Sequence, residues 1–170
     1  MQKKITSPFQ KVSRRGFLNG AFASFAVVAG LANQPALAAE TTLSAKAAYK
    51  KAKTGEIILV DIRTPGEWAQ TGVGEGAIGI DMQGGQEFIN SLMQLRQLYP
   101  EKPIALICRT GNRSSVVFDY LKSQGTSGFV DVTEGMAGGP NGRGWIPRGL
   151  PTYAGTSANI KTRLQAVLTK

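Results

Sequence analysis

The sequence predicts an α/β fold in which a central, mostly parallel sheet is covered by helices on both faces, giving three layers. Segments with helical spacing of apolar residues alternate with short runs that are apolar at nearly every position. Continuously apolar strands are expected where both faces of a sheet are buried. Their alternation with helices is typical of parallel strands joined by helical connections.

Residues 1–38 have the features of an export signal and are left out of the fold prediction. They contain five basic residues, no acidic residue, an apolar segment at 21–31 and a small-residue site, ALA, at 36–38. The stretch SRRGFL at 13–18 resembles a twin-arginine signal, which bacteria use to export folded proteins. We therefore expect cleavage near Ala38, a single domain over 39–170 and a periplasmic location.

The composition argues against several functions. Residues 1–38 account for +5 of the formal charge of +9, and the remainder has no basic run interleaved with aromatic residues, so we expect no nucleic-acid partner. The apolar segment at 21–31 is shorter than a membrane span requires, so we expect no stable span after cleavage. One cysteine and no histidine leave no basis for a metal site. The G-x-G-x-x-G match at 74–79 follows a helix-like segment, and we expect no cofactor.

The first half of the predicted domain contains two helices, two strands and a turn. A helix is predicted over 43–53, because apolar residues recur at helical spacing before Thr54 and Gly55. The run IILVD predicts a buried strand at 57–61, and TPGEWAQTG at 64–72 predicts a turn with a short helix. AIGID predicts a second strand at 77–81, and a helix over 88–98 ends before Pro100.

The second half repeats the alternation. IALIC predicts a strand at 104–108, SSVVFDYLKSQG a helix at 114–125 that ends at Gly125, and FVDV a strand at 129–132. A segment rich in glycine and proline follows at 135–151, and a last helix is predicted over 160–170. Cys108 therefore lies at the carboxyl end of a strand, where ligands bind in open parallel sheets.

The loop CRTGNRS at 108–114 has properties that suit an anionic ligand beside a reactive sulfur. A loop between a strand and a helix directs several backbone N–H groups into one hollow, and the helix N-terminus adds a partial positive charge. Gly111 permits a backbone conformation that a side chain would forbid. Arg109 and Arg113 add full charges, so we expect Cys108 to be held largely as the nucleophilic thiolate.

Several segments together resemble the rhodanese family. CRTGNRS is similar to its active-site pattern Cys-x-x-Gly-x-Arg-Ser, and DIRTPGEW at 61–68 is similar to its Asp-x-Arg-x-x-x-Glu-aromatic signature. GAI at 76–78 resembles the Gly-Ala-x that follows, and Gly135, Trp145 and GLP at 149–151 resemble the family's closing motif. These segments stand in the family's order and span about residues 43–152.

The resemblance implies a rhodanese-like fold and a sulfurtransferase. Cys108 would take the outer sulfur of a donor such as thiosulfate as a persulfide and pass it to cyanide, a thiol or a periplasmic protein. Backbone N–H groups would stabilise its negative charge, as an oxyanion hole does. The resemblance assigns the binding loop to Arg109, Thr110, Gly111, Asn112 and Arg113, with Asp61, Arg63, Glu67 and Ser114 as supporting residues.

The supporting residues have more specific expected roles. Arg109 is expected to face the donor, and Arg113 to hold the loop through Asp61 or Glu67. Asp61 and Arg63 are expected to form a capping ion pair at the strand end. The remaining expectations are helix caps at Asn112 or at Ser114 and Ser115, and core positions for Trp68 and Trp145.

Two departures and two alternatives accompany this interpretation. The sequence has GVG at 72–74 where the family usually has Gly-His-Ile, and residues 138–144 form a longer segment that we expect at the rim of the site. One alternative is a cysteine phosphatase or arsenate reductase, although such phosphatases use Cys-x5-Arg and this loop is Cys-x4-Arg. The other alternative is a non-catalytic rhodanese-like binding module, which often lacks the cysteine that is present here.

Overall fold

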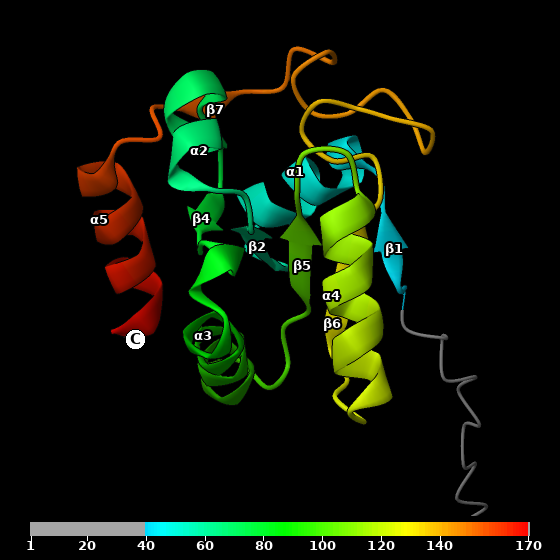
Figure 1. Ribbon diagram of the computed structural model, residues 1–170, viewed down its shortest axis with the longest axis vertical. Coiled ribbons are helices and arrows are strands. Elements are labelled where there is room, and N and C mark those ends of the chain that lie inside the picture. Colours follow the sequence, from blue (N-terminus) through cyan, green and yellow to red (C-terminus); the bar gives the residue numbers. More distant parts are fainter. Residues whose placement is uncertain (1–39, 170) are drawn as a thin grey trace, which may run out of the picture. The chain divides into compact units, whose positions relative to one another are not determined.

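The computed structural model describes residues 40–169 (Figure 1). The export signal expected at 1–38 lies outside this range. Within the range, no helix combines the length and the apolarity that crossing a bilayer requires.

A five-stranded sheet forms the centre of the described part of the chain. Its strands, in order across the sheet, are β1 (Thr42–Leu43), β6 (Phe129–Val132), β5 (Ile104–Ile107), β2 (Ile58–Asp61) and β4 (Ala77–Gly79). Every neighbouring pair is parallel, as predicted. Two further strands, β3 (Val73–Gly74) and β7 (Thr152–Tyr153), pair antiparallel in a separate ribbon.

Helices cover both faces of the sheet, which confirms the predicted three layers. Over residues 40–169 they are α1 (Ala45–Lys53), α2 (Pro65–Thr71), the 3₁₀ turn η1 (Met82–Gly84), α3 (Gln86–Leu98), α4 (Asn112–Ser123) and α5 (Ser157–Leu168). Figure 1 shows α3 and α4 in front of the sheet and α1 behind it. Apolar residues of α3 and α4 belong to one core cluster, and those of α1 and α2 belong to the other.

The alternation of side chains along β2 and β5 explains why both runs are apolar throughout. Ile58 and Val60 of β2 join the cluster beneath α3 and α4, whereas Leu59 joins the cluster on the opposite face. In β5, Leu106 lies on the first face and Ile107 on the second. A strand with both faces buried has no position at which a polar side chain would reach water.

Several predicted boundaries differ from the structure. Leu43, predicted as the start of a helix, ends the edge strand β1, because Ser44 accepts a hydrogen bond from the N–H of Ala47 and caps α1. The last helix begins at Ser157 rather than at 160, because Thr156 caps it in the same way. Helix α4 begins at Asn112, two residues earlier than predicted, and β5 ends one residue before Cys108.

Candidate functional site at the carboxyl end of strand β5

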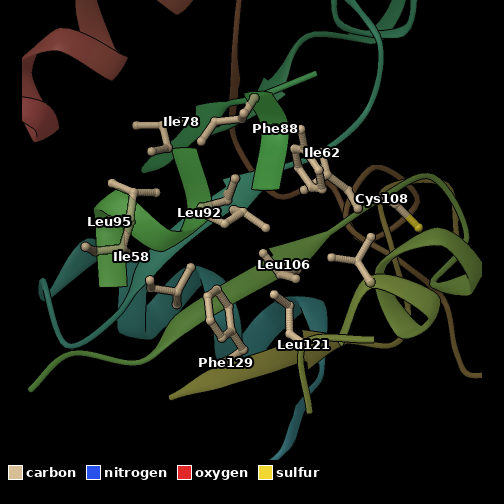
Figure 2. Packing of buried hydrophobic residues seen from close by; sticks show 14 of the residues in the cluster. Ile58, Ile62, Ile78, Phe88, Leu92, Leu95, Leu106, Cys108, Leu121 and Phe129 are labelled. Carbon is tan, nitrogen blue, oxygen red and sulfur yellow. The ribbon is translucent and has the colours of Figure 1, made fainter. Parts of the chain in front are cut away.

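Cys108 follows the last residue of β5 and is completely buried, with 0% of its surface exposed. It continues the alternation of β5, so its Cβ lies on the same face as Leu106. Figure 2 shows Cys108 at the edge of this apolar cluster, with its sulfur directed away from the other labelled side chains. The strand therefore places one nucleophilic atom at the base of the loop that leads into α4.

Hydrogen bonds from the segment that follows β6 hold the loop after Cys108 in place. The carbonyl oxygen of Cys108 accepts a 2.8 Å hydrogen bond from the N–H of Met136, and the carbonyl of Arg109 accepts one of 2.7 Å from Ala137. In contrast, no N–H group from Arg109 to Arg113 has an acceptor within residues 40–169. The carbonyl oxygens of Cys108 and Arg109 are thus occupied, and a series of N–H donors remains available for an anion.

Gly111 is required by the path of this loop. Its φ is +91°, in the left-handed region, and a Cβ built on it would lie 1.9 Å from the carbonyl oxygen of Thr133. A side chain would therefore clash with backbone as well as strain the conformation. The sequence prediction that a glycine is needed here is confirmed.

The predicted helix caps at Asn112, Ser114 and Ser115 are wrong. Gly111 is the N-cap residue of α4 and the helix has no side-chain cap. Ser114 and Ser115 lie within the first turn, and their hydroxyl groups donate backwards to the carbonyl of Gly111, at 3.0 Å and 2.9 Å. A residue must precede the first turn to cap its N–H groups, and the left-handed backbone at Gly111 occupies that position.

Ser114 lies between the loop and the sulfur. It is buried, and its Oγ lies 3.5 Å from Cys108 Sγ. A hydroxyl at this distance can donate a hydrogen bond to a thiolate or accept one from a thiol. The structure therefore gives Ser114 a contact with the sulfur of Cys108 rather than a capping role.

Glu67 and Arg113 connect α2 to the start of α4. The guanidinium of Arg113 donates two hydrogen bonds to Glu67, of 2.9 Å and 2.6 Å. This pairing lowers the pKa of Glu67 to about 2, and it raises the pKa of Arg113. Of the two partners predicted for Arg113, Glu67 is the one that it contacts.

Arg109 has a different environment from Arg113. It is exposed, and its guanidinium forms no hydrogen bond or ion pair in the described part of the chain. It lines an open cavity above the loop, where it is available to an approaching anion. The residues lining this cavity are Glu67, Arg109, Thr110, Asn112, Arg113, Ala137 and Gly138.

Asp61 and Arg63 form a buried ion pair at the end of β2. Arg63 Nη2 lies 2.7 Å from Asp61 Oδ2, and the side chains are 2% and 0% exposed. Arg63 also donates to the hydroxyl of Thr71 and the carbonyl of Gly72, which ties the strand end to the end of α2. The predicted ion pair is confirmed, and its burial away from the cavity makes it part of the framework.

Val73 stands where the family usually has histidine, and it fits its site. It is fully buried in β3 and pairs with Tyr153 of β7. The apolar side chain thus replaces the histidine without leaving a polar group to satisfy. Trp68 and Trp145 are also buried, as predicted, and Trp145 Nε1 donates to the carbonyl of Pro151.

Two acidic residues near the site were not predicted. Asp131 of β6 is buried and accepts a hydrogen bond from Ser115. Glu134 pairs with Arg148, which lowers the pKa of Glu134, and it also accepts from the N–H of Ala45. The sequence contains one feature that could have indicated Asp131, since it is an acidic residue inside the otherwise apolar strand FVDV.

Residues 44–139 match the model of the rhodanese-like domain family. The chain belongs to the rhodanese-like domain family. The match covers β2, β5, β6 and the loop at 108–114, so it includes every residue that the sequence analysis assigned to the site. The fold and the position of the cysteine loop therefore agree with the family that its motifs resemble.

Other proteins resemble part of this chain. A protein of Allochromatium vinosum named "Sulfurtransferase" is 30% identical over 103 residues, covering 61% of this chain and 84% of that protein. An uncharacterized protein of Rickettsia prowazekii is 26% identical over 98 residues, covering 55% and 80%. The crystal structure of Rv0390 from M. tuberculosis has a TM-score of 0.51 at 22% identity, covering 66% and 96%, which shows a shared fold.

Proposed function

We propose that the protein is a sulfurtransferase that carries sulfur as a persulfide on Cys108. The observation that supports this most directly is the placement of one buried sulfur beneath a loop whose N–H groups from Arg109 to Arg113 have no acceptor within residues 40–169. Such a site stabilises an anion formed on the sulfur itself. The sulfurtransferase of A. vinosum, which is 30% identical, supports the same chemistry.

The reaction with thiosulfate has two steps, and each conserves atoms and charge. The thiolate of Cys108 attacks the outer sulfur of thiosulfate, a new S–S bond forms, and sulfite leaves with the electron pair of the bond that breaks. An acceptor such as cyanide then attacks the outer sulfur of the persulfide, giving thiocyanate and restoring the thiolate. Because Cys108 has no exposed surface, the loop has to move far enough for the outer sulfur of the donor to reach Cys108 Sγ.

The residues around Cys108 divide into positioning and binding roles. Glu67 holds Arg113, so this arginine fixes the start of α4 and adds positive charge near the sulfur. Arg109 is unpaired within residues 40–169 and exposed at the cavity, so it attracts the anionic donor. The N–H groups of the loop bind the outer sulfur of the persulfide.

The arrangement of Arg113 argues against a phosphatase. A phosphatase loop needs its arginine free to hold phosphoryl oxygens in a bidentate manner. Here both nitrogens at the end of the Arg113 side chain are engaged by Glu67. Phosphate binding would therefore require this ion pair to open first.

Intact-mass measurement tests the proposed chemistry. The purified domain is weighed before and after thiosulfate, with a Cys108→Ser variant treated in parallel. We expect a gain of one sulfur atom that cyanide removes and that the variant lacks. If the thiol stays free and titratable and gains no sulfur from thiosulfate or from a thiol persulfide, the sulfurtransferase proposal fails and a binding module is favoured.

We further propose that the protein acts in the periplasm. The support is the motif SRRGFL at 13–18 together with the apolar segment at 21–31 and the ALA site at 36–38. Replacing Arg14 and Arg15 by lysine should retain the precursor in the cytoplasm, as seen by cell fractionation. Unchanged export of that variant would exclude the twin-arginine route.

A further inference from the structure

Asp131 is a buried acid immediately behind the cysteine loop. It lies on β6, opposite Leu106 of β5, and is 3% exposed. Its Oδ2 accepts a 2.5 Å hydrogen bond from Ser115 Oγ. Its Oδ1 has no hydrogen-bond partner in the described part of the protein. Burying an ionised carboxylate with one oxygen unsatisfied is costly, so the site disfavours the charged form of Asp131.

The carbonyl oxygen of Gly111 has more donors than it can use. The N–H of Ser115 lies at 3.0 Å, the hydroxyl of Ser114 at 3.0 Å and the hydroxyl of Ser115 at 2.9 Å. A carbonyl oxygen has two lone pairs, and each hydroxyl has one hydrogen. Once the N–H is bound, either hydroxyl suffices, and the other is free for a different acceptor.

Each hydroxyl has an alternative acceptor. For Ser115 it is the carboxylate of Asp131, and for Ser114 it is the sulfur of Cys108 or that same carboxylate. When Asp131 is ionised, Ser115 donates to it, and Ser114 donates to the carbonyl of Gly111 or to the carboxylate rather than to the sulfur. When Asp131 is protonated, it donates to Ser115, Ser115 donates to Gly111, and the hydroxyl of Ser114 can turn to the sulfur.

We propose that Asp131 is a positioning residue whose protonation decides, through Ser115, whether Ser114 donates a hydrogen bond to Cys108. The protonated acid favours the thiolate and the persulfide anion, and the ionised acid withdraws that donor. The effect on the thiol follows from the described contacts alone. Its consequence for sulfur transfer rests on the function proposed above.

The surroundings of Asp131 act on its pKa in opposing directions. Burial raises the pKa of Asp131, and the charge of Asp119 on α4 raises it further, while hydrogen bonds from Ser114 and Ser115 oppose the rise. The neighbouring strand β1 contributes no charge there, since Thr42 is the residue paired with Asp131. On the side of the sulfur, the facing cation is Arg113, which Glu67 holds in place.

Ultraviolet absorbance of the thiolate tests the proposal without requiring a reagent to reach the buried sulfur. The reduced domain is titrated with pH, and a Cys108→Ser protein is subtracted to remove the tyrosine signal. The variants are Asp131→Asn, Ser115→Ala and the double variant. Asparagine has the shape of the protonated acid and carries no charge, so it should leave Ser114 free to donate to the sulfur at every pH.

We expect the midpoint of thiolate formation in Asp131→Asn to fall by about half to one pH unit, the equivalent of one hydrogen bond. The double variant lacks the hydroxyl of residue 115, so Ser114 must again donate to the carbonyl of Gly111. The midpoint of thiolate formation should therefore return to that of Ser115→Ala. A shift that persists in the double variant would show that Asp131 acts on the sulfur without Ser115, either by its charge or directly through Ser114, and would overturn the proposal. The absence of any shift in Asp131→Asn, with circular dichroism confirming the fold, would overturn it as well.

These results are independent of sulfur transfer. If wild-type protein takes no sulfur from any donor but the midpoints behave as expected, the sulfurtransferase proposal fails and the coupling of Asp131 to Cys108 stands. If sulfur is transferred but the midpoints do not move, the reverse holds. Measuring persulfide formation on the same samples by intact mass separates the two cases.

Discussion

Replacing Glu67 by glutamine isolates the ion pair that holds the start of α4. Glu67 has two roles, since its carboxylate also accepts a hydrogen bond from the N–H of Thr64 in a capping box at α2. Glutamine retains a capping box but cannot form a charged pair with Arg113. The substitution therefore removes the ion pair between α2 and the cysteine loop but keeps the N-terminal cap of α2.

The expected loss of stability follows from the pKa of Glu67. The pairing with Arg113, together with smaller contributions from the hydrogen bonds of Thr64, lowers this pKa from 4.5 to about 2. The whole change corresponds at face value to about 3 kcal/mol, and only the part due to Arg113 is lost in Glu67→Gln. The side chains of Arg113 and Glu67 are 32% and 22% exposed, so screening by water reduces the expected contribution to about 1–2 kcal/mol. Urea denaturation at neutral pH should show this loss in Glu67→Gln.

The same pair predicts a dependence on acid. Because the pKa of Glu67 is lower in the folded protein than in the unfolded chain, its stabilisation is complete above about pH 4.5 and is lost as the pH falls towards about 2. Wild-type protein should lose more stability than Glu67→Gln over this interval. Glu75→Gln is the matched control, since its pair with Arg163 is more exposed and should matter little. Parallel acid profiles for wild type and Glu67→Gln would refute the reasoning.

Three further substitutions probe the loop and its framework. Gly111→Ala should destabilise the fold by about 3 kcal/mol or more and abolish persulfide formation. The control is Gly125→Ala, at φ +73° with open space around it, which should cost only about 1 kcal/mol. Urea denaturation of both variants compares the two losses. Asp61→Asn leaves Arg63 buried without its counter-charge and should cost about 3–5 kcal/mol; a loss below 1 kcal/mol would show that water reaches the pair. Arg109→Gln should leave the free energy of unfolding within about 0.5 kcal/mol of wild type but slow loading by thiosulfate and weaken its salt dependence; loading kinetics at two ionic strengths decide.

The central sheet could be predicted because its strands are apolar on both faces. The predicted range 129–132 matches β6 at both ends, and 104–108 exceeds β5 by one residue. The two-residue strands β1, β3 and β7 were missed, because so short a segment has no periodicity of its own. Val73 and Tyr153 pair across 80 residues, and nothing local to either indicates that contact.

Within the site, the sequence predicted the residues better than their contacts. Cys108, Gly111 and the pairing of Arg113 with Glu67 follow from a loop motif and an acid on the neighbouring helix. The roles of Ser114 and Ser115 were mistaken, because serine near a helix start usually caps it. Only the backbone at Gly111 shows that the helix has already begun two residues earlier.

The residues that escaped prediction are those whose function depends on another segment. Met136 and Ala137 contribute only their N–H groups, which any residue except proline supplies, so no sequence pattern marks them. Yet their hydrogen bonds to Cys108 and Arg109 leave the N–H groups of the loop facing the opposite way. Because that second segment follows β6, and β6 also carries Asp131, a change in either alters the donors available to the sulfur. The surroundings of Cys108 are therefore formed by β5, the loop and β6 together, and the sequence motif covers only the loop.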